Sequence, residues 1–423
     1  MDGGAEGTKL DAPMATFSTQ FLGCKVSFAD AQAISERLRA DGHTEGERGD
    51  LAIVNTCCVT HEAVSKSRQA VSKAARSHRR VYVTGCAANL DGAFREVADN
   101  VLVVPRVGDE AAAAVAGDVG AIACVQDGHR LERTRAFVKI QDGCSFSCAF
   151  CVIPLVRGGT RSRRADAVLA EARRRAEQGH REIVLTGVDI SDYGSGLPGE
   201  MTLGKLVRQI LRHVPELKRL RLSSIDQVEA DAQLIAAIAE EPRLMPHLHL
   251  SLQAGDNLTL KRMKRRHSRA DAVAFCARVR QLRPDIVFGA DLIAGFPTET
   301  EDMFAGSLQL VDECGLTFLH VFPFSPRPGT PAARMPQVAR AVVKERAACL
   351  RAKGAAALSS YLEAQVGRAV EVLMERDHLG RTPGFAQMLL AGSAAAGCLL
   401  AARVTGSSGR LLQGEPFAPT CAS

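Results

Sequence analysis

Three cysteines near the middle of the chain constrain its fold more than any other feature. Cys144, Cys148 and Cys151 form a C-x3-C-x2-C pattern within QDGCSFSCAFC, directly after an apolar run of strand length at Phe137–Ile140. A zinc knuckle would need a fourth cysteine or histidine close by, and none follows at that spacing. The pattern predicts a loop at the carboxyl end of a β-strand whose three thiolates hold a metal centre with one open position.

That open position fits a [4Fe-4S] cubane. Thiolates hold the irons of such a cluster, so three cysteines leave one iron without a protein ligand. S-adenosylmethionine (SAM) can chelate this iron through its amino and carboxylate groups, and an electron from the cluster then splits the sulfonium to a 5′-deoxyadenosyl radical. In such a site the cofactor supplies the chemistry and the protein positions it. A zinc knuckle or three buried thiols are the alternatives.

Short apolar runs alternate with helical patterns on both sides of this loop, which is typical of parallel α/β sheets. In the first part we expect strands at 15–20, 51–55, 81–84 and 101–104, and helices at 28–40, 61–77 and 91–98. Six further strands are expected at 137–140, 182–186, 219–223, 247–252, 287–293 and 318–323, with helices such as 165–177 and 301–313. Six such units predict an open (β/α)6 partial barrel.

The rest of the chain has a different pattern. An Ala-rich helix is expected at 339–363, and short strands broken by glycine follow, as in a small β-barrel. The most apolar run, Met388–Val404, is interrupted by glycine and serine. It falls short of a membrane helix and is interpreted as two strands around a turn.

These patterns predict an α/β protein with several domains. We expect a disordered extension at 1–14, a flavodoxin-like parallel sheet domain at 15–125, a linker at 126–136, the partial barrel at 137–363 and the small β-barrel at 364–423. The extension lacks the apolar core of a signal peptide. The cytoplasm is therefore the expected location, with no membrane partner and a monomer as the expected state.

Three more cysteines each follow an expected strand of the first domain. Cys24, Cys57 and Cys86 stand in the contexts FLGCK, VNTCC and VTGCA. The carboxyl ends of parallel strands share one edge, where ligands bind, so these thiols could hold a second cubane cluster. Three ordinary buried cysteines are the alternative. Cys58 adds a choice, because neighbours on an extended strand face opposite ways and only one can point at the cluster.

Several blocks of the sequence resemble the radical SAM methylthiotransferase family. QDGCSFSCAFCVIP is similar to its cluster loop. Similar later blocks are LTGVDISDYG at 185–194, HLHLSLQAGDNLTLKRMKR at 247–265, DLIAGFPTETED at 291–302 and HVFPFSPRPGTPAARM at 320–335. The resemblance runs from about Ala15 to the end of the chain.

The resemblance implies an N-terminal methylthiotransferase domain with an auxiliary cluster on Cys24, Cys57 and Cys86, so Cys57 is favoured over Cys58. It also implies two [4Fe-4S] clusters, SAM, and a C-terminal TRAM-like domain, with Gly380–Thr382 matching the GRT of that domain. The implied reaction takes hydrogen from carbon 2 of an adenine and inserts a methylthio group there. An electron donor such as flavodoxin or ferredoxin is implied as a partner.

Three targets occur in this family: isopentenyl-adenosine of tRNA, threonylcarbamoyl-adenosine at tRNA position 37 beside the anticodon, and an aspartate of a ribosomal protein. The sequence is most similar to the threonylcarbamoyl-adenosine branch. The similar segments are LGCKVSFADAQAI, NTCCVTHEAVSKSRQ and LHVFPFSPRPGTPAARMPQ, and the SKSRQ run at Ser65–Gln69 weighs most. A non-catalytic iron–sulfur RNA-binding protein and a structural zinc protein are the alternatives of another class.

Contacts with SAM are expected where barrel strands end. The expected residues are Gly187, Ser223, Ser224, Gln253, Asp291 and Gly295. Two basic runs near the expected catalytic mouth, together with the arginine of GRT, are predicted to contact tRNA, with phosphate contacts that make binding sensitive to salt. They are Arg157, Arg161, Arg163, Arg164, Lys261, Arg262, Lys264, Arg265, Arg266 and Arg381.

The remaining cysteines show no ligand pattern. They stand at 124, 276, 314, 349, 398 and 421. Core packing is the expected role, since free cysteine behaves as a small apolar side chain. The net charge of +6 permits an RNA partner without requiring one.

Overall fold

The chain folds into two units, and a short segment from the middle of the second belongs to the first. The structure, a computed structural model, describes residues 14–47, 49–94, 97–122 and 134–417. One unit comprises 1–130 together with Cys151–Gly159, and the other comprises Leu131–Phe150 and Thr160–Ser423. The expected extension at 1–14 (apart from Met14) and most of the linker at 126–136 lie outside the described residues.

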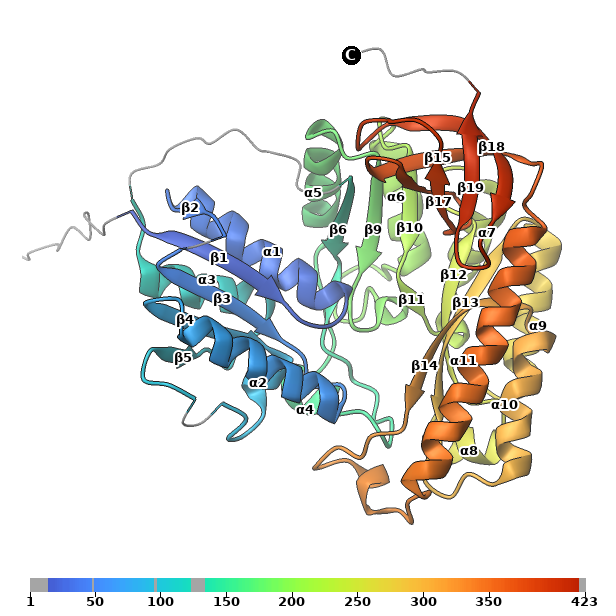
Figure 1. The fold of residues 1–423 in the computed structure, drawn as a ribbon, viewed down its shortest axis with the longest axis horizontal. Coiled ribbons are helices and arrows are strands. Elements are labelled where there is room, and N and C mark those ends of the chain that lie inside the picture. Colours follow the sequence, from blue (N-terminus) through green and yellow to red (C-terminus); the bar gives the residue numbers. More distant parts are fainter. Residues whose placement is uncertain (1–13, 48, 95–96, 123–133, 418–423) are drawn as a thin grey trace, which may run out of the picture. The chain divides into compact units, whose positions relative to one another are not determined.

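The first unit is a parallel sheet with helices on both faces (Figure 1). Its strands lie in the order β2 (Thr44–Glu45), β1 (Thr16–Phe21), β3 (Leu51–Thr56), β4 (Arg80–Gly85) and β5 (Val101–Val103). Its helices include α1 (Lys25–Ala40), α2 (His61–Ala75) and α3 (Gly108–Val119). Because side chains alternate along a strand, Ala52 and Val54 pack with α2 and Leu51 and Ile53 pack with α1 and α3.

One helix expected in this unit is absent. The described residues between 91 and 98 form turns, and a short 3₁₀ helix, η1 (Cys86–Asn89), precedes them. Gly92 adopts a φ of 68°, which is the left-handed conformation that ends a helix. The apolar Phe94 is buried in a core that also contains residues of α2 and η1. The apolar content of this segment was therefore mistaken for a helix face.

The second unit contains six parallel strand–helix units. Its strands are β6 (Arg135–Lys139), β9 (Glu182–Thr186), β10 (Arg219–Leu222) with its extension β11 (Ser224–Ile225), β12 (His247–Gln253), β13 (Val287–Ala294) and β14 (Leu316–Pro323). They form two parallel sheets, β10-β9-β6 and β11-β12-β13-β14. The helices are α5 (Ala165–Glu177), α6 (Leu203–His213), α7 (Ala232–Glu240), α9 (Arg269–Leu282), α10 (Glu301–Glu313) and α11 (Arg340–Glu363). The predicted partial barrel is confirmed.

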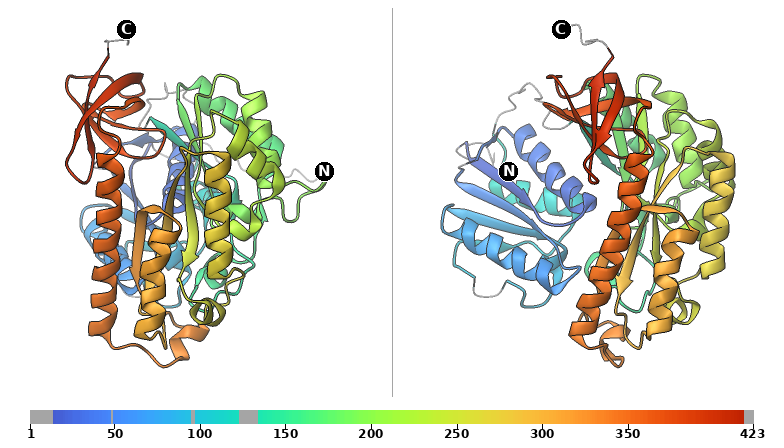
Figure 2. Two further views of the ribbon diagram at one scale, coloured as in Figure 1. Left: turned by 90° about the vertical axis from the view of Figure 1, so that its right-hand side faces the viewer. Right: turned by 45° about the vertical axis from the view of Figure 1, so that its right-hand side comes forward.

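The two faces of these strands differ in chemistry. Ile183, Leu185 and Leu220 belong to the apolar core beneath the helices, and Figures 1 and 2 show α9, α10 and α11 along that side of β12–β14. The alternate positions face the inside of the barrel. They include the polar Glu182 and Thr186 beside the apolar Val184, so buried polar groups stand on the inner face at both ends of β9.

The chain ends in a closed barrel of five strands. They are β15 (Ala369–Arg376), β16 (Leu379–Arg381), β17 (Gln387–Leu390), β18 (Leu399–Ser407) and β19 (Leu412–Pro416), closed in the order β15-β16-β17-β19-β18. The apolar run Met388–Val404 does form two strands around a turn, as expected. Among the described residues, no helix is both long and apolar enough to cross a membrane.

The small barrel covers the amino ends of the partial-barrel strands through buried charges. Arg221 donates to Glu182 at 2.8 Å and to the Pro383 carbonyl at 3.0 Å. Arg219 donates to the Arg381 carbonyl at 3.0 Å. Arg219, Arg221 and Glu182 are each at most 1% exposed. Glu182 is thus the shared counter-charge of two buried arginines.

The remaining cysteines only partly follow expectation. Cys276 and Cys314 are buried and hydrogen-bond to each other. Cys349 is exposed on α11, which contradicts its expected core role, because that helix turns this position to solvent. Cys398 packs against the core of the small barrel and is in addition disulfide-bonded, which was not expected. Cys124 and Cys421 lie outside the described residues.

Glu182→Gln should destabilise the chain strongly. Removing this carboxylate leaves the buried Arg221 without its bonded counter-charge and leaves Arg219 with Glu371 alone, and breaking a buried pair costs about 3–5 kcal/mol. Glu371→Gln is the matched control, since Glu371 also pairs with Arg219 but is 55% exposed and should cost about 1 kcal/mol or less. Denaturant unfolding followed by circular dichroism measures both, and equal losses would contradict the assignment.

Candidate metal centres

The first cysteine trio lies at one edge of the N-terminal sheet. Cys24 is the N-cap of α1 after β1, Cys57 follows β3, and Cys86 begins η1 after β4. β1, β3 and β4 are neighbours and run parallel. The three cysteines therefore follow neighbouring strands at one edge, as expected, and the binding of one cluster by their sulfurs stays a prediction.

Two glycines allow neighbouring chain segments to approach closely at this edge of the sheet. Gly23 has a φ of 119°, and a side chain there would lie 2.9 Å from Cβ of Cys57. Gly85 has a φ of 86°, and a Cβ there would lie 2.6 Å from the Thr56 carbonyl oxygen. Only glycine combines such backbone angles with such close approach. The GC contexts at Cys24 and Cys86 are therefore a steric condition for bringing the sulfurs together.

Burial and neighbouring charges shift the pKa values of two thiols of this trio in opposite directions. Burial raises the pKa of the Cys57 thiol to about 11. A hydrogen bond from Cys58, supported by the positive charge and the N–H of Arg157, lowers the pKa of the Cys86 thiol to about 6 against the effect of burial. Cys86 is therefore the thiol held as a thiolate at neutral pH, which is the form that binds metals.

The neighbouring cysteines have different surroundings. Cys57 is fixed through its backbone by Ser67 of α2, whose hydroxyl accepts from the Cys57 N–H at 3.2 Å. Cys58 is fully buried among apolar residues of the sheet, including Val83, while its thiol bonds to Cys86. Ser67 belongs to the SKSRQ run, so that run has a structural role at the trio. The choice of Cys57 as the ligand stays a prediction.

The second trio starts in the loop after β6. The backbone N–H of Ala149, next to Cys148, donates to the Met263 carbonyl at 3.0 Å. Arg265 donates to Cys148 Sγ at 3.6 Å. Cys144 and Cys148 lie in the second unit, whereas Cys151 begins the segment that groups with the first. The convergence of all three sulfurs thus stays a prediction from their spacing.

A buried glutamine fixes the start of this loop. Gln141 is fully buried and its amide donates to the carbonyls of Asp142 and Gly143, at 3.1 and 2.7 Å. Its side-chain oxygen accepts from the Asp189 N–H at 2.8 Å. A side chain at Gly187 would lie 2.9 Å from the Gln141 carbonyl. Gly187, an expected SAM contact, is therefore required by this close packing in the structure.

Buried polar atoms without partners gather where β9 and β10 end. Among the described residues, Thr186 Oγ1, Ser223 Oγ and both amide atoms of Gln227 have no hydrogen-bond partner. Buried polar groups are almost always paired. These groups, one of them the expected Ser223, fit a polar ligand at this rim, which is the end of such barrels that carries their active sites.

Acidic residues make the same rim suited to a cation. Burial, then the carboxylates of Glu229 and Asp226, raise the pKa of Asp189 to about 7. Arg266 offsets part of this charge through an ion pair with Glu229 at 2.9 Å and stacks on Phe146 of the cysteine loop at 3.5 Å. The amino and sulfonium groups of SAM are cations of the kind that these carboxylates would hold.

Two other expected SAM contacts, Asp291 and Gly295, form hydrogen bonds within the protein. Hydrogen bonds from His249 and His320 to Asp291, at 2.9 and 3.2 Å, hold the pKa of its carboxyl far below the usual range although burial opposes this. The Gly295 N–H donates to Glu299 at 2.9 Å, so this N–H is engaged within the protein and the expected SAM contact of Gly295 stays a prediction. Gln253 ends β12 with a φ of 68°.

Ser224 is half-buried and pairs with His249 in the sheet. It follows Ser223, whose buried hydroxyl has no hydrogen-bond partner among the described residues. The SAM contacts of Gly187, Ser223, Ser224, Gln253 and Asp291 stay predictions.

Three of the arginines expected at RNA face inward. Arg157 is 4% exposed and pairs with Asp30, and the Arg265 side chain is 10% exposed and pairs with Asp226. Arg381 is bonded to Glu375 within the small barrel. The burial of Arg157 contradicts its expected contact with RNA, whereas the contacts of Arg265 and Arg381, whose guanidinium groups are paired within the protein, stay predictions.

The other basic residues are more accessible. Arg163 bonds the Lys139 carbonyl and Glu171, and Arg262 bonds the Thr298 carbonyl. Exposed side chains are Arg161, Arg164, Lys261, Lys264 and Arg266. These also remain predicted tRNA contacts.

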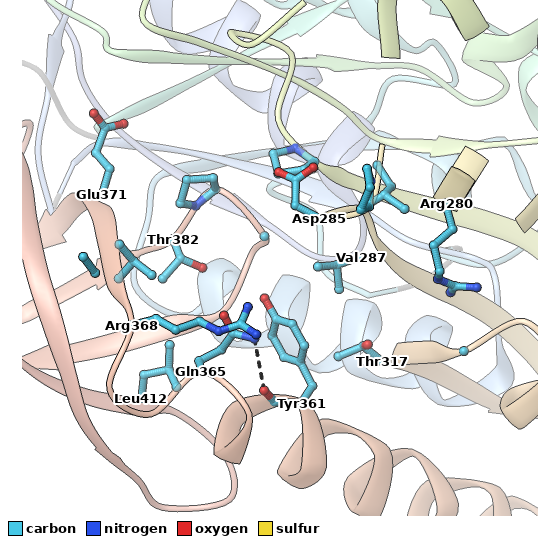
Figure 3. A pocket seen from close by; sticks show the side chains of 18 residues that line it. Arg280, Asp285, Val287, Thr317, Tyr361, Gln365, Arg368, Glu371, Thr382 and Leu412 are labelled. Carbon is cyan, nitrogen blue, oxygen red and sulfur yellow. Dashed lines mark hydrogen bonds between the residues drawn. The ribbon is translucent and has the colours of Figure 1, made fainter. Parts of the chain in front are cut away.

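A cavity of about 520 Å³ lies elsewhere, at the amino ends of the partial-barrel strands beside the small barrel (Figure 3). Arg280, Asp285, Tyr361 and Arg368 line it. Catalytic residues of such barrels come from the opposite, carboxyl end of the strands. The cavity is therefore not the candidate active site.

Sequence reasoning missed the carboxylates that hold the site. Asp30 and Asp226 each bond an arginine next to a cysteine sulfur, and Asp189 gives the rim its charge. Asp30 and Arg157 are far apart in sequence, so no local pattern signals their pairing. An acidic residue between apolar residues on one helix face, as Asp30 between Val26 and Ile34 of α1, would have been the one available sign.

Comparisons with known proteins agree with this architecture. The model of the Radical SAM superfamily matches residues 138–311, and that of Uncharacterized protein family UPF0004 matches residues 16–104. The solved structure of the radical S-adenosylmethionine methyltransferase TsrM from Kitasatospora setae aligns with a TM-score of 0.52 at 13% identity, covering 74% of this chain and 76% of that one. Cysteine loop and partial barrel thus define a radical SAM protein.

Curated relatives narrow the family. The chain is 40% identical to the threonylcarbamoyladenosine tRNA methylthiotransferase MtaB of Rickettsia prowazekii (strain Madrid E), covering 91% of this chain and 94% of the relative. It is 34% identical to the tRNA-2-methylthio-N(6)-dimethylallyladenosine synthase of Ruegeria pomeroyi, covering 86% and 88%. The chain belongs to the radical SAM methylthiotransferase family.

Asp189→Asn should remove a pH-dependent loss of stability. The raised pKa of Asp189 means that the folded state binds a proton which the unfolded state releases, so stability falls as the pH rises from about 4 to about 7. The melting temperature of the variant, relative to the unchanged protein, should therefore increase between about pH 5 and about pH 8. Asp302→Asn, at an exposed site of α10, is the control. Parallel pH profiles for Asp189→Asn and the parent would contradict this.

Proposed function

We propose that the chain is a tRNA methylthiotransferase that converts N6-threonylcarbamoyladenosine at position 37, beside the anticodon, to its 2-methylthio derivative. The observation that carries this proposal is the first cysteine trio, at the edge of the N-terminal sheet. A partial barrel with its own cysteine loop needs no further thiols to generate a radical. Cys24, Cys57 and Cys86 at the edge of a separate parallel sheet supply a place for sulfur chemistry.

The choice of substrate is supported by the relatives. Two relatives carry the threonylcarbamoyladenosine name, one at 40% and one at 32% identity, whereas the dimethylallyladenosine relatives are 32–34% identical, so the substrate choice is supported by the 40% relative. Dimethylallyladenosine, the isopentenyl form, is the second candidate substrate because these relatives also align over most of the chain.

The residues present fit two [4Fe-4S] clusters. Cys24, Cys57 and Cys86 would hold one, and Cys144, Cys148 and Cys151 the other, each leaving one iron open. When bound, the barrel cluster would supply the electron that cleaves SAM, and the auxiliary cluster would supply the site of sulfur delivery. Thiolate ligands are favoured at the first trio by the low pKa of Cys86.

The protein itself would bind and orient the reactants. Thr186, Ser223 and Gln227 offer unpaired polar atoms to SAM, and Asp189 with Glu229 offers carboxyl oxygens to its cationic groups, whose charge would in turn favour the ionised form of Asp189. The exposed basic residues around Arg161 and Lys261 would contact phosphates of tRNA, so binding should weaken as salt rises. The target hydrogen on adenine carbon 2 is not acidic, so no general base is required.

Partners follow from the reaction. A one-electron donor such as flavodoxin or ferredoxin would reduce the barrel cluster. We propose that a monomer acts on tRNA, since each chain carries both cysteine trios.

Deleting the gene should abolish one nucleoside. Tandem mass spectrometry of digested tRNA should show loss of 2-methylthio-threonylcarbamoyladenosine and accumulation of its precursor, while the 2-methylthio isopentenyl form persists. A plasmid copy should restore the product and a Cys148→Ala copy should not. Loss of the isopentenyl product instead would transfer the proposal to the second substrate, and no change in either would overturn it in favour of a non-catalytic protein.

Cys57→Ala should separate the two halves of the reaction. The reconstituted variant should still form 5′-deoxyadenosine from SAM but should insert no sulfur, because only the auxiliary trio is damaged. Cys148→Ala is the converse control and should form no 5′-deoxyadenosine. Liquid chromatography of both products measures this. Full product from Cys57→Ala together with an inactive Cys58→Ala would assign the ligand role to Cys58.

A further inference from the structure

At each cysteine trio an arginine N–H is directed at a cysteine sulfur. Arg157 Nε donates to Cys86 Sγ at 3.0 Å in the first unit, and Arg265 Nη1 donates to Cys148 Sγ at 3.6 Å in the second. Both arginines stand in the basic runs that were expected to contact tRNA. Both are turned inward, so their function lies within the protein.

A carboxylate holds the first arginine in place. Arg157 Nη2 donates to Asp30 Oδ2 at 2.7 Å, and the two side chains are 1% and 0% exposed. Asp30 lies on α1, the helix that Cys24 caps, and Arg157 ends α4 (Ile153–Arg157). One edge of the guanidinium thus faces the carboxylate and its Nε faces the sulfur.

The second arginine repeats this arrangement with other elements. Arg265 Nη2 donates to Asp226 Oδ2 at 2.7 Å and to the Ser251 carbonyl at 2.8 Å, while Nη1 faces Cys148. The side chains of Arg265 and Asp226 are 10% and 5% exposed. The segments around Arg157 and Arg265 differ in sequence. In both, one guanidinium group lies between a carboxylate, which it binds, and a cysteine sulfur, to which it donates.

Stability alone gives little reason for such pairs. Removing two charges from water costs free energy that their attraction rarely exceeds, and apolar residues often replace a buried pair without loss. A cationic N–H near a sulfur has a direct effect on an iron–sulfur cluster, because hydrogen bonds to the sulfurs and local charge set its reduction potential. The donor stabilises the reduced cluster, which carries more negative charge.

We infer that Arg157 and Arg265 are positioning residues that raise the reduction potentials of the auxiliary and barrel clusters respectively, each oriented by its carboxylate, Asp30 or Asp226. This inference rests on the proposed function, since it requires both clusters. The shorter distance and deeper burial at Cys86 make the larger effect the one at the auxiliary cluster.

Conservative variants of the full-length chain test this. Arg157→Lys and Arg265→Lys keep a positive charge but lose the planar donor edge, and Arg157→Gln and Arg265→Gln also lose the charge. Each is reconstituted anaerobically and titrated with dithionite while electron paramagnetic resonance follows the reduced clusters. The Arg157 variants are measured with Cys148→Ala, and the Arg265 variants with Cys24→Ala, so that one cluster is observed at a time.

Arg157→Lys should move the auxiliary midpoint to a more negative potential, with a larger move in Arg157→Gln. Arg265→Lys should do the same to the barrel cluster. In chains that keep both clusters, each Lys variant should leave the spectrum of the other cluster unchanged. Iron content and circular dichroism show that cluster and fold are intact, and Arg157→Lys decides the matter if Arg157→Gln does not fold.

Two results would overturn the inference. One is an unchanged midpoint in Arg157→Lys and Arg265→Lys with full iron content, which would make the arginines structural. The other is an equal shift of both clusters by either variant, which would show a general effect on the protein. Absence of any cluster on Cys24, Cys57 and Cys86 in the otherwise unchanged chain would instead defeat the proposed function.

Discussion

Parallel strand pairing is the constraint on which both candidate centres depend. Strands that run in one direction end at one edge, so residues that follow different strands meet there although they are far apart in sequence. Cys24, Cys57 and Cys86 follow three neighbouring strands of the first sheet. The cysteine loop after β6 and the polar groups after β9 and β10 use the same rule in the partial barrel.

Buried ion pairs position charged side chains beside the cysteines that the strand topology brings to each edge. Asp30 and Asp226 hold arginines against Cys86 and Cys148, and Glu182 neutralises two arginines at the opposite end of the barrel. Segment 151–159 belongs to the first unit. It carries both Cys151, a predicted ligand of the barrel cluster, and Arg157, which bonds the auxiliary trio. One short segment therefore serves both proposed centres.

Much of this could be predicted from the sequence, because strand and helix periodicity is local. The helices 165–177 and 301–313 begin and end as expected, and the edge position of Cys57 followed from the strand before it. The arginines could not be placed, since a run of charge suggests a solvated surface and the partners of Arg157 and Arg265 come from distant segments. The helix predicted at 91–98 was wrong, because Gly92 adopts a left-handed backbone conformation. A pattern of apolar residues does not indicate such a conformation.

The central claim is that six cysteines hold two clusters. The direct measurement is iron and acid-labile sulfide per chain after anaerobic reconstitution, with Mössbauer spectra to identify the cluster type. We expect about eight irons per chain, as two cubanes require, and about four after joint replacement of Cys24, Cys57 and Cys86 by alanine. About four irons in the unchanged chain, unaffected by that replacement, would contradict the claim.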